Sequence, residues 1–110
     1  MAGNQSAVFA ALADPTRLRV VELLGSQPYR AGELAREIGI SAPVMSRHLR
    51  VLLRAGIVAD ERLPDDARAR VFRLQPEQIA ATQAWLDQVQ AHWDEQLQSF
   101  KRHVEKGQTR

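Results

Sequence analysis

Hydrophobic residues recur at helical spacing through the first 24 positions of the chain. The pattern predicts one helix over 6–13 and a second over 15–24, separated by Asp14-Pro15, because the residue before a proline avoids the helical region. The second helix is apolar around much of its circumference, through Leu18, Val20, Val21, Leu23 and Leu24. We therefore expect it to be the most buried helix of the chain.

Two further helices with a tight break between them are predicted over 31–55. The first covers 31–38 and ends at Gly39, a residue that turns a chain without steric cost. Ser41 stands where an N-cap belongs, and the second helix of this pair follows over 42–55. The pattern indicates a helix-turn-helix.

The helix over 42–55 has two different faces. Its apolar stripe is formed by Met45, Leu49 and Leu52. Its polar face carries Ser46, Arg47, Arg50 and Arg54, and the segment from Ser41 to Gly56 contains no acidic residue. An α-helix is about as wide as the major groove of B-DNA, so an apolar back with an Arg/Ser front is typical of a recognition helix. We therefore expect this face, Arg54 included, to contact DNA, together with Ser41 at the start of the helix. A basic face that is simply solvated is the alternative.

A β-hairpin is predicted directly after this helix. Residues 57–63 and 68–74 indicate two strands around a turn at 64–67, which is rich in Pro and Asp. A hairpin in this place is a wing, and Arg68 and Arg70, with Arg62 as a weaker candidate, would project from it toward the DNA backbone or the minor groove. Tyr29-Arg30 could form one more short strand.

A long C-terminal helix is predicted over 76–105. Its apolar positions follow a near-heptad spacing: Leu86, Val89, Trp93, Leu97, Phe100 and Val104. A small domain cannot easily bury such a stripe by itself, so we expect a homodimer whose interface combines this helix with Phe9 of the first helix. Packing of the stripe on the helix over 15–24 is the alternative.

Composition narrows the class of protein. The 110 residues are 45% hydrophobic and 25% charged and contain no cysteine, which predicts one globular domain over 1–110 without disulfides or thiolate metal sites. The absence of a long apolar run or a secretory signal pattern predicts a cytoplasmic protein that does not enter the membrane. Residues 1–74 carry eleven arginines against eight acidic residues, and arginine suits bidentate contact with guanine and phosphate.

Three stretches resemble the ArsR family of winged helix-turn-helix repressors: ALADPTRLRVVELL (11–24), GELAREIGISAPVMSRHLRVLLRAGIV (32–58) and RARVFRL (68–74). The resemblance covers nearly the whole chain. It implies a mainly α fold with a small β-hairpin, and a bacterial homodimer that binds a palindromic operator in double-stranded DNA and represses transcription, often of its own operon. It also implies DNA contact by Ser46, Arg47, His48, Arg50, Arg68 and Arg70.

The cysteine pair that binds metals in the best-known members is absent from 31–38, so the chain resembles the cysteine-free subgroup, whose inducers are mostly unknown. His92 and His103 match the histidine spacing of the family's zinc site. The positions of the two carboxylate ligands are Gln90 and Lys106, and neither is a good zinc ligand. We therefore expect no metal or other cofactor, and a zinc-responsive repressor using His92 and His103 remains an alternative.

Other functions are weighed against DNA binding. His48 lies between the two faces of its helix, so it either touches DNA or packs beneath the helix-turn-helix. Ser46 and His48 are two residues apart on a helix and do not face each other, and no other nucleophile with a base is evident, so we expect no enzyme. A winged-helix module whose basic face binds an acidic protein is the alternative from a different class.

Overall fold

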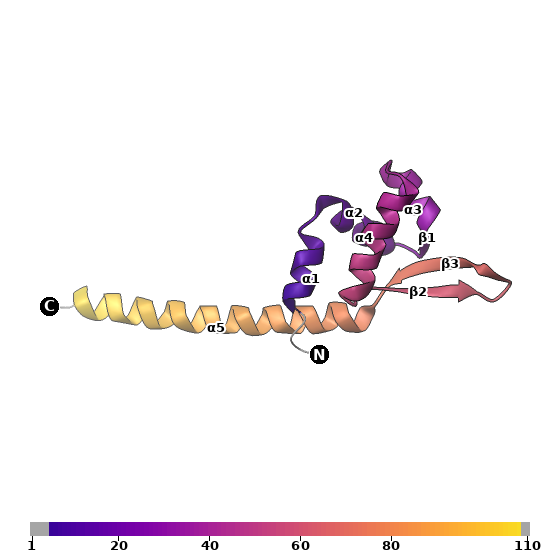
Figure 1. The fold of residues 1–110 in the computed structure, drawn as a ribbon. Coiled ribbons are helices and arrows are strands. Elements are labelled where there is room, and N and C mark those ends of the chain that lie inside the picture. The colour runs from indigo at the N-terminus through magenta and orange to yellow at the C-terminus, as the bar shows by residue number, and fades with distance from the viewer. Residues whose placement is uncertain (1–4, 109–110) are drawn as a thin grey trace.

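The computed structural model describes residues 5–108, and its element order confirms a mainly α fold with a small sheet (Figure 1). The helices are α1 (Gln5–Leu12), α2 (Pro15–Leu24), α3 (Ala31–Ile38), α4 (Ala42–Arg54) and α5 (Pro76–Gln108). The strands are β1 (Tyr29–Arg30), β2 (Val58–Leu63) and β3 (Asp66–Leu74). Within the described residues, no helix has the length and apolar character needed to cross a membrane.

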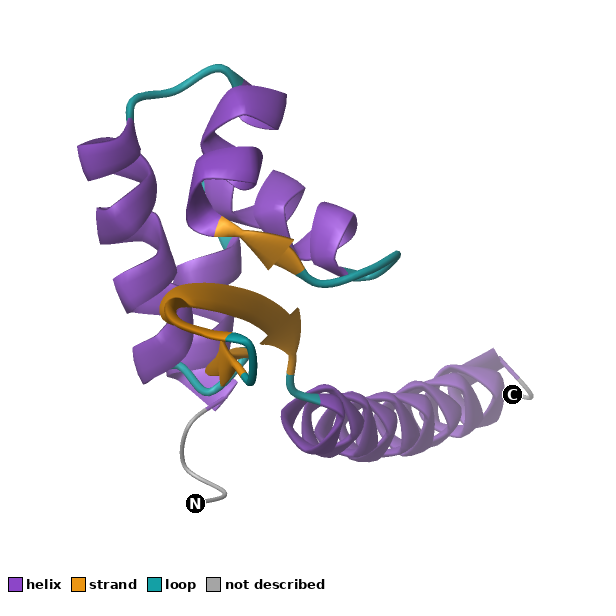
Figure 2. Ribbon diagram, turned by 90° about the vertical axis from the view of Figure 1, so that its right-hand side faces the viewer, coloured by secondary structure: helices purple, strands orange, loops and turns teal. Residues whose placement is uncertain are grey.

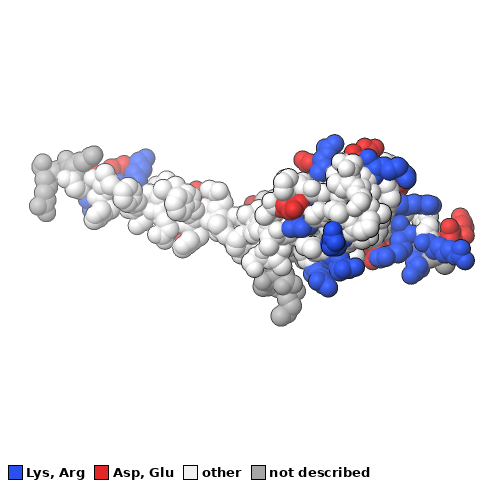
Figure 3. Space-filling model, turned by 45° about the horizontal axis from the view of Figure 1, so that its top comes forward, with Lys and Arg blue, Asp and Glu red and all other residues white. Residues whose placement is uncertain are grey.

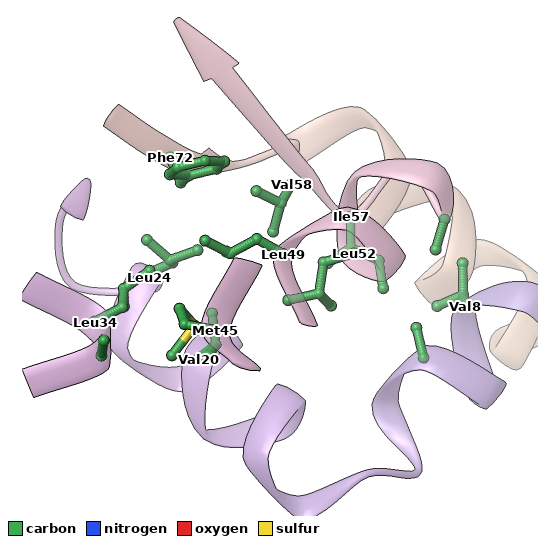
Figure 4. Close-up of a cluster of buried hydrophobic side chains, with 13 residues drawn as sticks. Val8, Val20, Leu24, Leu34, Met45, Leu49, Leu52, Ile57, Val58 and Phe72 are labelled. Carbon is green, nitrogen blue, oxygen red and sulfur yellow. The ribbon is translucent and has the colours of Figure 1, made fainter. Parts of the chain in front are cut away.

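The core is built around the apolar back of α4. Met45, Leu49 and Leu52 are buried, as their spacing predicts. Figure 4 shows them converging with side chains from each neighbouring element: Val8, Val20, Leu24, Leu34, Ile57, Val58 and Phe72. Since burial of a leucine-sized side chain contributes about 1.5–3 kcal/mol, this cluster holds α4 in a fixed orientation while its other face stays exposed.

The expectation that α2 is the most buried helix is wrong. Val20 and Leu24 of α2 are buried, but Leu18 is 44% exposed, and α4 contributes more buried side chains than α2. A domain of this size has too few elements to surround one helix on all sides, so one flank of α2 meets solvent.

The helix boundaries are set by local hydrogen bonds. Asp14 caps α2, and its Oδ1 accepts from the backbone N–H groups of Thr16 at 2.8 Å and Arg17 at 3.1 Å. The Arg17 backbone hydrogen bond is the main cause that lowers the pKa of the Asp14 carboxyl below its usual value. Ser41 caps α4 by accepting from Val44 N–H at 3.3 Å. Gly39 ends α3 in the left-handed region with φ 82°, which explains why glycine stands there.

The three strands form one antiparallel sheet in the order β1-β3-β2 (Figure 2). The hairpin turn is tighter than the sequence pattern predicts: β3 begins at Asp66, and only Pro64 and Asp65 separate the strands. The pairing is irregular between Arg62 and Leu63, so Leu63 pairs with Asp66, which lets the strands meet two residues earlier than expected.

Helix α5 extends far beyond the rest of the molecule (Figure 1). It has 33 residues, which correspond to about 50 Å at 1.5 Å per residue. The radius of gyration is 20.0 Å, against about 13 Å for a compact chain of this length. The attachment of α5 to the globular head includes the Phe9 and Trp85 rings, with centroids 5.5 Å apart, and the hydrogen bond from Gln75 N–H to the Ile57 carbonyl at 2.8 Å. Most of α5 therefore has no packing partner within the described chain.

Candidate nucleic-acid interface

The exposed side of α4 carries the residues that the sequence pattern predicts for base contact. Ser46, Arg47 and Arg50 are all exposed, while Leu49 between them is buried in the core. Because the buried stripe holds the helix from behind, the two arginines are presented on a rigid support. Ser41, the remaining predicted contact near the helix start, is exposed at the N-cap of α4.

A groove of about 440 Å³ lies between α4 and the wing. It is lined by Ser46, Leu49, Arg50 and Leu53 of α4, by Arg68, Ala69, Arg70 and Phe72 of β3, and by Arg30 and Ala31 at the start of α3. Four of these ten residues are arginines and none is acidic. Clustered arginines attract phosphate, so this groove has the chemistry required to hold a nucleic-acid backbone, although one of the four, Arg70, already has an acidic partner outside the lining.

The two predicted wing arginines are in different states. Arg70 is ion-paired with Asp60 of β2, with Nε donating to Oδ2 at 2.8 Å, and its guanidinium carbon lies 5.2 Å from the centroid of the Phe72 ring. Asp60 thus neutralises part of the Arg70 charge. The Arg68 backbone N–H donates to Asp66 Oδ1 at 3.0 Å, and its exposed side chain forms no ion pair within the described residues. Of the two, Arg68 carries the more available positive charge.

Of the three arginines of α4, Arg50 lines the groove, whereas Arg47 and Arg54 do not. Arg54 lies on the flank of α4 that faces α1, where a pocket of about 320 Å³ is lined by Ala7, Ala10, Ala11, Arg17, Val51, Arg54 and Ala55. The structure therefore brings Ser46 and Arg50 together with the wing and separates Arg54 from them.

His48 is directed toward α2. Its ring is partly buried, and Nδ1 lies 3.2 Å from Nη1 of Arg17. The structure thus shows the packing role that the sequence pattern left open for this residue. A DNA contact through the other ring nitrogen stays a prediction.

Arg30 is a groove residue that the sequence pattern did not single out. It reaches the groove because β1 pairs with β3, with Arg30 opposite Val71. The two partners are separated by about forty positions, so no local periodicity signals the approach. A basic residue in the predicted strand at 29–30, next to the helix-turn-helix, was the one available hint.

The two histidines considered for zinc are both exposed on α5. His92 and His103 are eleven positions apart, or about 16 Å along the helix axis, so a single chain cannot bring both to one ion. Among residues 5–108, no group of three or more His, Asp or Glu side chains lies close enough together to hold a metal ion.

The second notable surface is the apolar stripe of α5. All six predicted seam residues are exposed, with Trp93 at 57% and Phe100 at 66%. In Figure 3 the basic side chains gather over the head and the wing, whereas much of the α5 surface is uncharged. A contiguous apolar patch of this kind marks an interaction surface.

Comparison with known proteins gives a consistent result. The family described as "Helix-turn-helix domain" matches residues 12–61. The HTH-type transcriptional regulator Rv2034 of Mycobacterium tuberculosis is 46% identical over 77 residues, which cover 70% of this chain and 69% of that protein. The transcriptional repressor SdpR of Bacillus subtilis is 40% identical over 55 residues, which cover 50% of this chain and 61% of that protein. The solved ArsR-like transcriptional regulator from Rhodococcus sp. RHA1 superposes with a TM-score of 0.81 at 28% identity, covering 90% of this chain and 91% of that one.

Proposed function

This chain belongs to the ArsR family of winged helix-turn-helix DNA-binding transcriptional regulators, which are not enzymes, and on that premise we propose that it is a homodimeric repressor of a palindromic operator. The observation that carries the proposal is the acid-free groove between α4 and the wing, lined by four arginines. The relative SdpR is a transcriptional repressor, which supports repression rather than activation. Its place of action would be the cytoplasm, where bacterial DNA is found.

In this proposal α4 enters the major groove. Arg47 and Arg50 contact base edges, since an arginine can donate two hydrogen bonds to O6 and N7 of guanine. Ser46 and the N-terminal turn of α4 at Ser41 contact phosphates. The wing arginines and Arg30 hold the backbone that passes between α4 and β3.

The proposed dimer pairs the α5 helices of two copies in antiparallel orientation. The apolar stripe reads nearly the same in both directions about position 95, which would place Leu86 against Val104 and Trp93 against Leu97 of the second copy. The charges also favour this orientation. Residues 76–96 carry four acidic and no basic residues, while 97–108 carry three Lys/Arg and one Glu. Antiparallel pairing about position 95 brings Asp87 of one copy level with the basic segment of the other, next to Arg102, whereas parallel pairing would set Asp87 level with itself. Two recognition helices then meet half-sites about 34 Å apart.

The first test of DNA binding is fluorescence anisotropy on the DNA immediately upstream of the chain's own coding sequence. We expect Arg50→Ala to weaken binding by about 1–3 kcal/mol and to relax the preference at one base position, because a bidentate base contact is lost. The matched control is Arg19→Ala, which removes an exposed arginine from α2, away from the groove. Equal affinity of the Arg50 and Arg19 variants would show that the wrong face of α4 has been assigned to DNA.

A second prediction separates the wing arginines by their salt dependence. Arg68→Ala should weaken binding to all sequences and reduce the slope of log affinity against log salt by about 1, since one phosphate contact is lost. Arg70→Ala should reduce the slope less, because Asp60 already neutralises part of its charge. A larger loss from Arg70→Ala than from Arg68→Ala would contradict this assignment.

The interaction-module alternative predicts a different outcome in the same experiments. A basic face that binds an acidic protein would give weak duplex binding that unrelated competitor DNA abolishes. Wild-type affinity that resists competitor, together with the loss in Arg50→Ala, would exclude that alternative.

A further inference from the structure

Arg17 joins three elements of the head through its side chain. Its Nε donates to the Ala11 carbonyl at 2.6 Å and Nη2 to the Ala10 carbonyl at 3.5 Å, both at the C-terminal end of α1. Its Nη1 lies 3.2 Å from Nδ1 of His48 on α4. Helix α1 also contacts α5 through Phe9 and Trp85. The Arg17 guanidinium is therefore a direct polar link between the recognition helix and the α1–α5 layer.

The contact with Arg17 determines which ring nitrogen of His48 carries the proton. A guanidinium has N–H donors and no acceptor, so Nδ1 of His48 must accept. An accepting Nδ1 carries no proton, and the ring is then neutral with its proton on Nε2. A cationic His48 would instead set an N–H of its own against Nη1 of Arg17 at 3.2 Å. The Asp14 carboxylate that begins α2 accepts from the Arg17 backbone N–H, which anchors Arg17 from its other side.

We propose that Arg17 is a positioning residue that holds His48 as the neutral Nε2–H tautomer and thereby makes it a hydrogen-bond donor to DNA. The inference rests on the proposed function, because the acceptor for Nε2–H is a phosphate or base oxygen or nitrogen of the operator. His48 is adjacent to Arg47 on α4, and its contact with Arg17 restricts rotation of the ring before DNA arrives. Preorganisation of this kind raises affinity by lowering the ordering cost of binding.

The first experiment reads the tautomer directly. Long-range 1H–15N NMR correlation of the imidazole in the free wild-type protein at neutral pH should show His48 with Nε2 protonated and Nδ1 bare. In Arg17→Met the ring should become a mixture of tautomers. The control Arg19→Met removes an exposed arginine two positions along the same helix and should leave the His48 signals unchanged. A wild-type ring protonated on Nδ1, or on both nitrogens, would overturn the proposal.

The second experiment measures operator affinity. Arg17→Met should bind the operator roughly threefold to tenfold more weakly than Arg19→Met, the range expected for one neutral hydrogen bond. If Arg17→Met fails to fold, His48→Asn decides the matter. Its amide oxygen can accept from Arg17 in place of Nδ1, but it lacks the Nε2–H donor, so the same weakening is expected at an unchanged melting temperature. Wild-type affinity of His48→Asn would overturn the DNA contact.

The two experiments test separate parts of the inference. The NMR measurement needs no DNA, so it tests the Arg17–His48 arrangement even if the wild-type protein binds no operator. Absence of wild-type binding would reject the proposed function, whereas normal binding with an unaffected His48→Asn would reject this inference alone.

Discussion

Replacing Leu97 with glutamate is expected to convert the proposed dimer into monomers and to weaken operator binding by about 100-fold, the loss typical of removing one of two linked binding sites. Leu97 is exposed in the single chain and lies within two positions of the centre of the apolar stripe. In an antiparallel pair, the two new carboxylates would lie close to the two-fold axis. Two like charges in an apolar interface carry a large desolvation cost, and neither has a partner there.

Analytical ultracentrifugation measures the first effect and fluorescence anisotropy the second. The wild-type protein should sediment at twice the 12.4-kDa chain mass and Leu97→Glu at the single mass. The matched control is Gln98→Glu, which introduces the same charge one position away, on a side of α5 that lies outside the stripe. A Leu97→Glu variant that remains dimeric would place the interface elsewhere, and monomeric wild-type protein would reject the dimer.

The second large effect is expected from Leu52→Ala, which should lower the free energy of unfolding by about 2–5 kcal/mol. Leu52 is 0% exposed and lies in the centre of the cluster that joins α4 to the rest of the head. Truncation removes its buried methyl groups and leaves a cavity between rigid elements. Because domains of this kind are stable by only about 5–15 kcal/mol, the loss is a large fraction of the total.

Urea unfolding followed by circular dichroism, at one fixed protein concentration, measures this change. Leu18→Ala is the matched control, since it removes the same atoms from a leucine that is 44% exposed, and a loss well below that of Leu52→Ala is expected. Leu52→Met should also cost less, about 1.5 kcal/mol at most, because it conserves volume. Equal losses at positions 52 and 18 would mean that α4 is not held by this core.

Local sequence patterns predicted most of the secondary structure. The spacing of Met45, Leu49 and Leu52 identified the buried face of α4, and burial in the structure confirms it. Gly39 and Ser41 identified the break between α3 and α4, because a left-handed residue and an N-cap are needed within a few residues of each other. Each of these signals depends on neighbours in sequence, and for that reason it can be read without a structure.

Two expectations failed where a local pattern was insufficient. The apolar circumference of α2 suggested deep burial, but burial depends on how many elements surround a helix, and Leu18 remains exposed. The Pro/Asp-rich turn suggested four connecting residues, but strand pairing extended to Leu63 and Asp66. Tertiary packing decided the first outcome, and an irregularity in strand pairing between Arg62 and Leu63 decided the second.

The sequence by itself determined the order and type of the helices and strands, which face of α4 is apolar, and to which family the chain belongs. Only the tertiary structure decided how the charged side chains are paired. In the structure, Arg70 forms an ion pair with Asp60, and Arg17 contacts His48. Arg30 lines the groove, whereas Arg54 lies outside it. Periodicity follows from the geometry of one element and is therefore local, whereas a side-chain partner such as His48, 31 positions from Arg17, is determined only when distant elements pack.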